Sequence, residues 1–227
     1  SEVSIRAARR RTPNAFLATK VSFINMVADL CEATGTNVDD VALGMGMDPR
    51  IGTAYLNPGV GFGGYCLPKD VSAFRWIAGQ HGVDFSLLGE VSAINDARAD
   101  RLIARMRSVM WVLRGKKVAV WGLAFKPNTD DVREAPSIPV IERLTQEEVR
   151  LRLYDPAAMP PFRDIFPSSP PGIEYCGSAK EATEGADALL VLTEWPEFAA
   201  ADLASVRERM AAPLIIDGRN VFDPEKV

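Results

Sequence analysis

The spacing of apolar residues changes close to residues 114–117, and this change divides the chain into two kinds of fold. Before it, apolar residues recur every three or four positions, as on one face of a helix. After it, short apolar runs predict strands at 118–121, 149–154, 188–192 and 214–216, with helical patterns at 138–144 and 203–210. Strands that alternate with helices form a parallel sheet with right-handed crossovers. We therefore predict an α/β chain with an all-helical first domain and a Rossmann-like parallel-sheet domain after it.

The helical part is expected to end in one long helix. An earlier helix runs from Leu17 to a stop at Gly35, and a short one follows an N-cap at Asn37. The long helix at residues 86–113 would span roughly 40 Å at about 1.5 Å per residue, which favours a connector between domains, with a dimer seam as the second interpretation. Residues 156–172, rich in Pro and Ser, are expected to form a surface loop. The expected domains are 1–85 (helical), 86–113 (connecting helix) and 114–227 (Rossmann-like).

Charge and cysteine content narrow the class of protein. The net charge is −4, from 26 basic and 30 acidic residues, which argues against a nucleic-acid partner and against a basic membrane-surface module. No run approaches the roughly 18 apolar residues of a membrane span. The single histidine, His81, argues against a His-based metal site or a Ser-His-Asp triad, and we expect no metal. Three cysteines without short spacings indicate a reducing, cytoplasmic setting rather than a disulfide framework.

The strongest chemical signal is a glycine-rich stretch at residues 59–64 that leads into Cys66. Glycines let a backbone approach a ligand closely and adopt positive φ angles. Cys66 lies where a helix is expected to begin, and a helix N-terminus and a nearby cation such as Lys69 both stabilise a thiolate. Asp70, one helical turn on, could orient or deprotonate a water. The alternative is a buried structural cysteine in a glycine-rich turn.

A second signal follows the first predicted strand, at residues 122–134. Loops at this place in α/β sheets bind ligands. Gly122 stands alone, and the chain contains no G-x-G-x-x-G, so this is not a dinucleotide fingerprint. Lys126 and Arg133 could contact phosphates. The alternative is a solvated, charged loop.

Four segments in order, residues 14–20, 61–70, 122–134 and 217–220, resemble the UDP-glucose/GDP-mannose dehydrogenase family. The resemblance implies oxidation of the C6 alcohol of a nucleotide sugar to a carboxylate, UDP-glucose to UDP-glucuronate, with two NAD. It assigns catalytic roles to Cys66, Lys69 and Asp70: Cys66 would form a thiohemiacetal and then a thioester, and Asp70 would help activate the hydrolytic water. A thiolate suits this chemistry because it is both a strong nucleophile and a good leaving group.

The resemblance also assigns binding residues, position by position. It implies that Arg50 reaches the substrate of a partner subunit in a homodimer, and that Arg133 approaches NAD. The residues implied to line the sugar-nucleotide site are Asn14, Tyr55, Asn57, Phe62, Gly63, Phe125, Lys126 and Arg219.

Two departures from the family keep alternatives open. The family's N-terminal NAD-binding domain has no counterpart in this sequence, and Arg10 stands where the family has a catalytic lysine, within residues 1–13 that do not resemble it. Arginine stays protonated and cannot shuttle a proton as lysine can. The chain alone is therefore expected to be inactive. The alternatives are a non-catalytic binding and dimerisation fragment, and the same chemistry on GDP-mannose or a UDP-N-acetylhexosamine.

Overall fold

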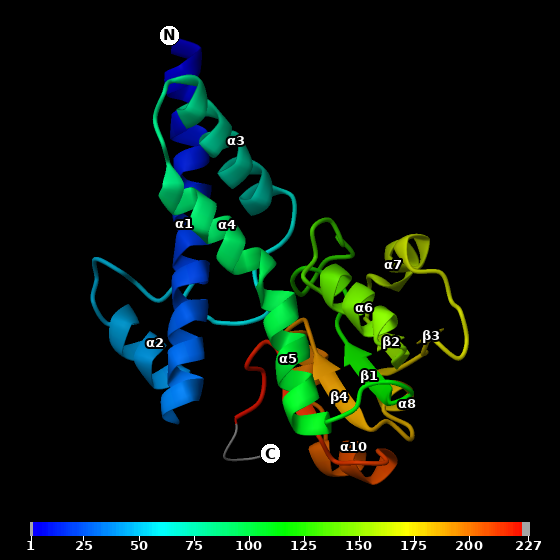
Figure 1. Cartoon of the computed structure of the whole chain (residues 1–227). Coiled ribbons are helices and arrows are strands. Elements are labelled where there is room, and N and C mark those ends of the chain that lie inside the picture. The colour runs from blue at the N-terminus through cyan, green and yellow to red at the C-terminus, as the bar shows by residue number, and fades with distance from the viewer. Residues whose placement is uncertain (1, 224–227) are drawn as a thin grey trace. The chain divides into compact units, whose positions relative to one another are not determined.

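The computed structural model describes the backbone of residues 2–223 and, within it, all side chains except those of residues 2–8 and 10. The chain forms two compact units, one ending at Arg98 and the other beginning at Ala99 (Figure 1). The first is helical and the second is an α/β sheet domain, as the sequence predicts. Among the described residues, no helix combines the length and the apolar character needed to cross a lipid bilayer.

The first unit is organised around its longest helix. This unit contains α1 (Glu2–Thr34), α2 (Val38–Gly46), α3 (Cys66–Gln80) and α4 (Ser86–Asp96). Helices α3 and α4 pack along α1, as Figure 1 shows. Helix α1 begins well before the expected Leu17 and contains Pro13, whereas Asn37 caps α2 as predicted, accepting from the Asp39 N–H. The core of this unit is formed by Ala15, Ala18, Phe62, Val71, Leu88 and Val91.

The single long helix expected at residues 86–113 is two helices in the structure. Helix α4 ends at Asp96, and α5 (Arg98–Met110) begins after Ala97. The sequence pattern contains no Gly or Pro at the break, so it gave no sign of it. Of the apolar stripe, Val91, Met106 and Leu113 are buried, whereas Leu87 and Val109 are exposed.

The second unit is a five-stranded sheet in which every pair of neighbours is parallel. The strands lie in the order β3-β2-β1-β4-β5, which is the doubly wound Rossmann order 3-2-1-4-5-6 without its sixth strand. Their bounds are β1 (Lys117–Trp121), β2 (Arg150–Tyr154), β3 (Ile173–Tyr175), β4 (Ala188–Val191) and β5 (Ile215–Asp217). The helices are α6 (Ser137–Gln146), α7 (Met159–Ile165), α8 (Ala179–Ala182), α9 (Pro196–Ala199) and α10 (Leu203–Arg209).

One sequence expectation for this unit needs correction, and three short elements were not predicted. Residues 156–172 are not a plain surface loop, because they contain α7, whose Phe162 is completely buried. Strand β3 and the short helices α8 and α9 were not anticipated. These elements are three or four residues long, too short for an apolar period to show.

The sheet order places a topological switch point between β1 and β4. Strand β1 pairs with β2 on one side and β4 on the other, so the loops after β1 and β4 both leave the carboxyl edge of the sheet, where the order of the strands reverses. Gly122, directly after β1, has a φ of +96°, and a Cβ there would lie 2.5 Å from the Thr193 Cβ. Only glycine lets the two loops approach this closely.

We predict that Gly122→Ala lowers the free energy of unfolding by about 2–4 kcal/mol, because it adds a steric clash to an unfavourable φ. Urea denaturation of this variant and of Gly115→Ala measures the difference. Gly115 also has a positive φ, +75°, but has open space around it, so its substitution should cost only about 1–2 kcal/mol. Equal losses for the two variants would contradict the close approach to Thr193.

Candidate functional site

Cys66 is the first residue of α3 and its side chain is exposed. The N–H groups of a first helical turn have no partners within the helix and favour negative charge nearby. The other two cysteines, Cys31 and Cys176, are buried free thiols. Burial raises the pKa of the Cys176 thiol to about 11. Of the three, Cys66 therefore has the surroundings of a nucleophile.

Asparagine side chains hold the glycine-rich loop before Cys66. The Asn25 Oδ1 of α1 accepts from the Gly59 N–H at 2.7 Å. Asn95 of α4 accepts from the Phe62 N–H at 2.8 Å, and its amide donates to the Phe62 carbonyl at 3.2 Å. The loop is thus fixed from two helices.

Asp70 lies in the first turns of α3 and is buried, with 4% of its surface exposed. Lys69 donates to its carboxylate at 2.8 Å and Asn14 of α1 donates at 2.6 Å, while Arg11 Nε lies 3.9 Å away. Burial acts to raise the Asp70 pKa, but the hydrogen bonds from Lys69 and Asn14 and the charges of Lys69 and Arg11 outweigh it, so the pKa lies below its usual value. Asp70 is therefore ionised at neutral pH.

The remaining predicted residues of this unit differ in exposure. Arg50 is largely exposed and forms a bidentate pair with Asp48. Tyr55, with a φ of +63°, and Asn57 are exposed. Phe62 packs into the apolar core, and Gly63 beside it is also buried. The Arg10 side chain lies outside the described residues.

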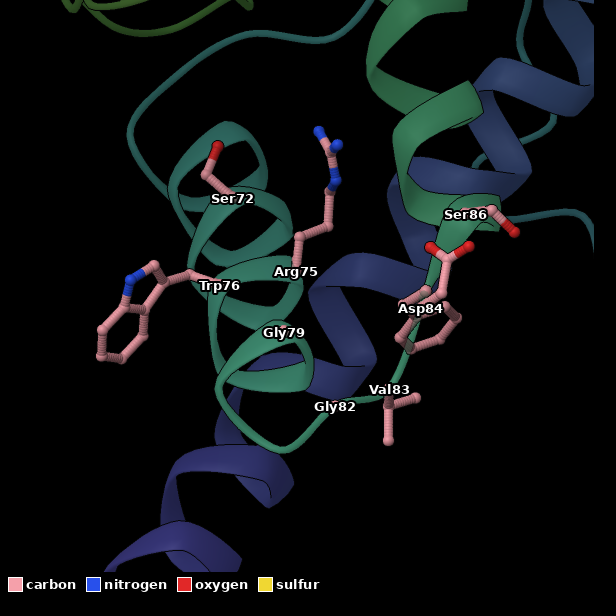
Figure 2. A pocket seen from close by; sticks show the side chains of 9 residues that line it. Ser72, Arg75, Trp76, Gly79, Gly82, Val83, Asp84 and Ser86 are labelled. Atoms are coloured by element: carbon pink, nitrogen blue, oxygen red, sulfur yellow. The ribbon is translucent and has the colours of Figure 1, made fainter.

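A surface hollow of about 570 Å³ lies between the later turns of α3 and the segment that leads into α4. Figure 2 shows Arg75 and Trp76 on the helix and Asp84 on the facing segment, with the Trp76 ring directed away from that segment. None of the residues that line this hollow was predicted for the site. The candidate chemistry therefore lies at the opposite end of α3.

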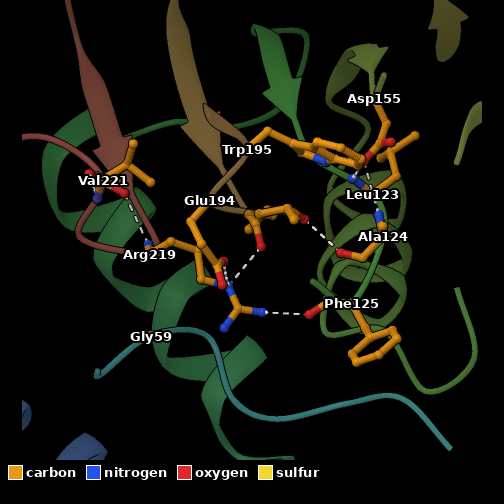
Figure 3. A network of polar contacts seen from close by, with 12 residues as sticks. Gly59, Leu123, Ala124, Phe125, Asp155, Glu194, Trp195, Arg219 and Val221 are labelled. Carbon is orange, nitrogen blue, oxygen red and sulfur yellow. Dashed lines mark hydrogen bonds and ion pairs between the residues drawn. The ribbon is translucent and has the colours of Figure 1, made fainter. Parts of the chain in front are cut away.

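In the second unit, Asp155 organises the carboxyl edge of the sheet. It follows β2, is 1% exposed and accepts five N–H groups. These donors are the backbone N–H groups of Leu123, Ala124, Ala157 and Ala158 and the indole of Trp195. Figure 3 shows the contacts from the β1 and β4 loops. One carboxylate thus joins the loops after β1, β2 and β4.

Arg219, beyond β5, extends toward the same loops (Figure 3). Its guanidinium donates to the Leu192 carbonyl at 2.9 Å and to the Phe125 carbonyl at 3.4 Å, and lies 3.5 Å from the Glu194 carboxylate. Burial lowers its pKa, and the charge of Glu194 opposes that effect. Arg219 and Phe125, both predicted for the site, are therefore brought together.

The two other predicted cations of this unit lie in the loop after β1. Lys126 is exposed and its ammonium lies 5.4 Å from the Phe125 ring centre. Arg133 forms a bidentate pair with Asp131, and this hydrogen bond lowers the pKa of Asp131. Lys126 is thus placed beside Phe125, while Arg133 is engaged by its own loop.

Sequence reasoning missed three residues that shape these sites: Asn95, Asp155 and Thr193. Thr193 donates to the Ala124 carbonyl at 2.6 Å. Asp155 and Thr193 each closely follow a strand that was predicted, so their positions at the carboxyl edge were the available signal. Asn95 lies inside a helix and carried no such signal.

Comparison with known proteins gives the same division of the chain. Residues 8–97 match the UDP-glucose/GDP-mannose dehydrogenase family, central domain, and residues 119–224 match that family's UDP binding domain. UDP-glucose 6-dehydrogenase YwqF of Bacillus subtilis is 42% identical over 97% of this chain and 50% of its own length. UDP-glucose 6-dehydrogenase of Pseudomonas aeruginosa is 43% identical over 94% of this chain and 48% of its own length.

Solved structures of nucleotide-sugar dehydrogenases are similar to this chain in fold. A UDP-glucose dehydrogenase from Pyrobaculum islandicum superimposes with a TM-score of 0.85 at 32% identity, over 93% of this chain and 46% of that one. A UDP-D-ManNAc dehydrogenase from Pyrococcus horikoshii gives a TM-score of 0.78 at 27% identity, over 97% and 48%.

A helical unit with a thiol at a helix N-terminus, followed by a parallel-sheet unit, is the architecture of part of a nucleotide-sugar dehydrogenase. The chain belongs to the UDP-glucose/GDP-mannose dehydrogenase family, a family of oxidoreductases. It spans about half the length of the curated relatives it matches.

We predict that iodoacetamide at neutral pH modifies Cys66 alone among the three cysteines. The reason is access and ionisation: Cys31 and Cys176 are buried, and a thiol with a pKa of about 11 is ionised in about one molecule in ten thousand at pH 7. Mass spectrometry of digested protein locates the label, and Cys66→Ser is the control that should take up none. Labelling of Cys176 at the rate of Cys66 would contradict the nucleophile assignment.

We predict that Asp70→Asn lowers the free energy of unfolding at pH 7 by about 1–2 kcal/mol, because it removes charge-assisted hydrogen bonds. A carboxyl whose folded pKa is depressed stabilises the fold above its unfolded pKa, about 3.9, and this contribution disappears as the pH falls through the folded pKa. The difference between parent and variant in urea denaturation should therefore narrow below about pH 4. Asp40→Asn, on the exposed side of α2, is the control and should show a smaller difference.

Proposed function

We propose that this chain carries the substrate-binding and thiol chemistry of a UDP-glucose 6-dehydrogenase, which oxidises UDP-glucose to UDP-glucuronate. The observation that supports it most is the exposed Cys66 at the N-terminus of α3, four residues before the buried Asp70 carboxylate. Relatives that are 42–43% identical over nearly the whole chain are UDP-glucose 6-dehydrogenases.

In this proposal Cys66 holds the sugar carbon while it changes oxidation state. The Cys66 thiolate adds to the C6 aldehyde, and the new C–S bond gives a thiohemiacetal whose oxygen takes a proton. Two NAD, bound by the whole protein, would supply the oxidising power: one hydride would leave as the C6 alcohol becomes the aldehyde, and a second as the thiohemiacetal becomes the thioester. Water then attacks the resulting thioester, the C–S bond breaks, and the thiolate leaves with the carboxylate released.

Asp70 acts in this proposal on the hydrolytic water. Because its pKa lies below the usual value, it is a hydrogen-bond acceptor that orients water rather than a strong base. Lys69 and Asn14, which both donate to its carboxylate, fix its direction, and the Lys69 charge also favours the oxyanion that forms on C6.

Contacts for the nucleotide sugar are proposed in each unit separately. Phe125, Lys126 and Arg219, near the carboxyl edge of the sheet, take the UDP part, and Lys126 is the exposed cation among them. Arg50, with its exposed guanidinium, reaches the substrate of a partner subunit. The other proposed contacts in the helical unit are Asn14, Tyr55, Asn57, Phe62 and Gly63.

The described residues of the second unit do not form a cradle for NAD. In a dinucleotide fold, the backbone N–H groups after the first strand bind the pyrophosphate. Here the N–H groups of Leu123 and Ala124 donate to Asp155 instead, and Gly122 lies against Thr193. Arg133 is the one residue proposed to approach NAD, so the cofactor's main contacts must come from outside these residues.

That finding favours a second candidate function, a binding and dimerisation module without turnover of its own. NADH formation by this chain alone with UDP-glucose and NAD would exclude it. A third candidate is the same chemistry on GDP-mannose or a UDP-N-acetylhexosamine. The similarity to a UDP-D-ManNAc dehydrogenase supports the second of these substrates. Competition among the nucleotide sugars distinguishes these.

A homodimer in the cytoplasm is part of the proposal. Phe16, Phe23 and Leu30 are spaced by seven residues on α1, and each is more than half exposed. Such a stripe suits helix packing between subunits. Light scattering with size-exclusion chromatography measures the assembly. The three free cysteines fit a reducing compartment.

We predict that UDP-glucose, but not GDP-mannose, binds this chain in a calorimetric titration, and that Lys126→Ala weakens the binding about fivefold by removing a charge-assisted phosphate contact. Arg209→Ala is the matched control, since Arg209 is an exposed cation at the end of α10 and should bind like the parent. Absence of binding to either nucleotide sugar would overturn the proposal that this chain carries the substrate site.

A further inference from the structure

Asn95 of α4 makes a two-hydrogen-bond contact with the loop that leads to Cys66. Its side chain pairs with both backbone groups of Phe62, accepting from the N–H at 2.8 Å and donating to the carbonyl at 3.2 Å. A single amide that satisfies both groups of one residue fixes the orientation of that peptide segment more firmly than either hydrogen bond alone.

The neighbouring glycine is required for this contact. Gly61 has a φ of +105°, and a Cβ at this position would lie 2.7 Å from the Asn95 Oδ1. Any other residue at 61 would push the loop away from α4. The glycine and the asparagine therefore act together.

The chain just after Asn95 is tied to α1. Arg98, the first residue of α5, forms a bidentate pair with Asp29 of α1, at 2.8 and 2.9 Å, and both side chains are 14% exposed. Ion pairs in such partly buried places are screened less than surface pairs. This pair lies three residues after Asn95 and limits how far the end of α4 can move from α1.

We propose that Asn95 is a positioning residue for the Cys66 site: by holding the Phe62 backbone it sets where Gly63 and the first turn of α3 present the thiol to the sugar. This proposal rests on the proposed function. Asn95 acts through the loop and does not contact the substrate.

Calorimetric titration with UDP-glucose tests the proposal on Asn95→Ala and Asn95→Asp. Both should bind about tenfold more weakly than the parent at pH 7.5, as expected for the loss of one or two hydrogen bonds. Ser92→Ala is the matched control on α4, because Ser92 bonds only within its own helix, and it should bind like the parent. Thermal melts of all variants verify that the fold is retained.

Lowering the pH provides a rescue that a merely structural role would not show. A protonated carboxyl can donate and accept as the amide does, so binding by Asn95→Asp should recover as the pH falls, while Asn95→Ala stays weak. The charged groups close to this contact are Arg98 and Asp29, which pair with each other in the parent and both variants. The parent, measured over the same range, corrects for other titrations. Failure of Asn95→Asp to recover relative to Asn95→Ala would overturn the proposal.

Two further measurements separate failure of this proposal from failure of the proposed function. If the parent does not bind UDP-glucose, the function fails, and Asn95 is judged by hydrogen exchange at Phe62 and by the Cys66 alkylation rate. Asn95→Ala should speed the exchange and change the alkylation rate about threefold, because a loosened loop no longer holds the Cys66 thiol in one orientation. Unchanged alkylation with accelerated exchange would overturn the positioning role.

Gly61→Ala gives an independent check. It should weaken UDP-glucose binding as Asn95→Ala does, and the double variant should lose less than the sum, since both single changes break one contact. Additive losses would show that Gly61 and Asn95 act separately, contrary to the proposal.

Discussion

The helical unit depends on buried polar side chains along one face of α1. An amide or carboxylate that loses its partner inside a protein costs about 1–3 kcal/mol, so each such pair fixes a distance between elements. They follow one another along α1 at intervals of eight, three and four residues, which puts them on the same side of the helix. Helix α1 therefore serves as the reference against which the nucleophile is placed. The pairs are Asn14 with Asp70, Ser22 with the Val91 carbonyl, Asn25 with Gly59, and Asp29 with Arg98.

In the sheet unit, a single carboxylate fixes the positions of several loops. Asp155 binds the loops after three of the strands, and this arrangement consumes the backbone N–H groups that a dinucleotide site would need. The unit thus has a Rossmann-like strand order but a different ligand edge. Fold alone does not determine what such an edge binds. Here Asp155, directly after β2, and the close approach of Gly122 to Thr193 determine which backbone groups are available to a ligand.

Much of the fold could be predicted from the sequence, because its strands and longer helices carry clear apolar periods. The Cys66 loop and the loop after β1 were predicted for a similar reason, since their glycines and charges are local signals. The break at Ala97 and the role of Asn95 could not be predicted. No Gly or Pro marks the break at Ala97. The role of Asn95 depends on its contact with Phe62, 33 positions away, and the sequence does not show whether an asparagine in a helix faces water or a loop.

The exposure of Cys66 has a consequence for survival under oxidative stress. A thiol that is accessible at a helix N-terminus is the kind that peroxides convert to sulfenic acid. Many redox-sensing proteins limit the damage with a second, nearby thiol that forms a disulfide. Cys31 and Cys176 are both buried, so within this chain no accessible thiol can capture the oxidised sulfur. Its repair must come from small-molecule thiols in the surrounding solution, and without them oxidation would proceed to irreversible acids.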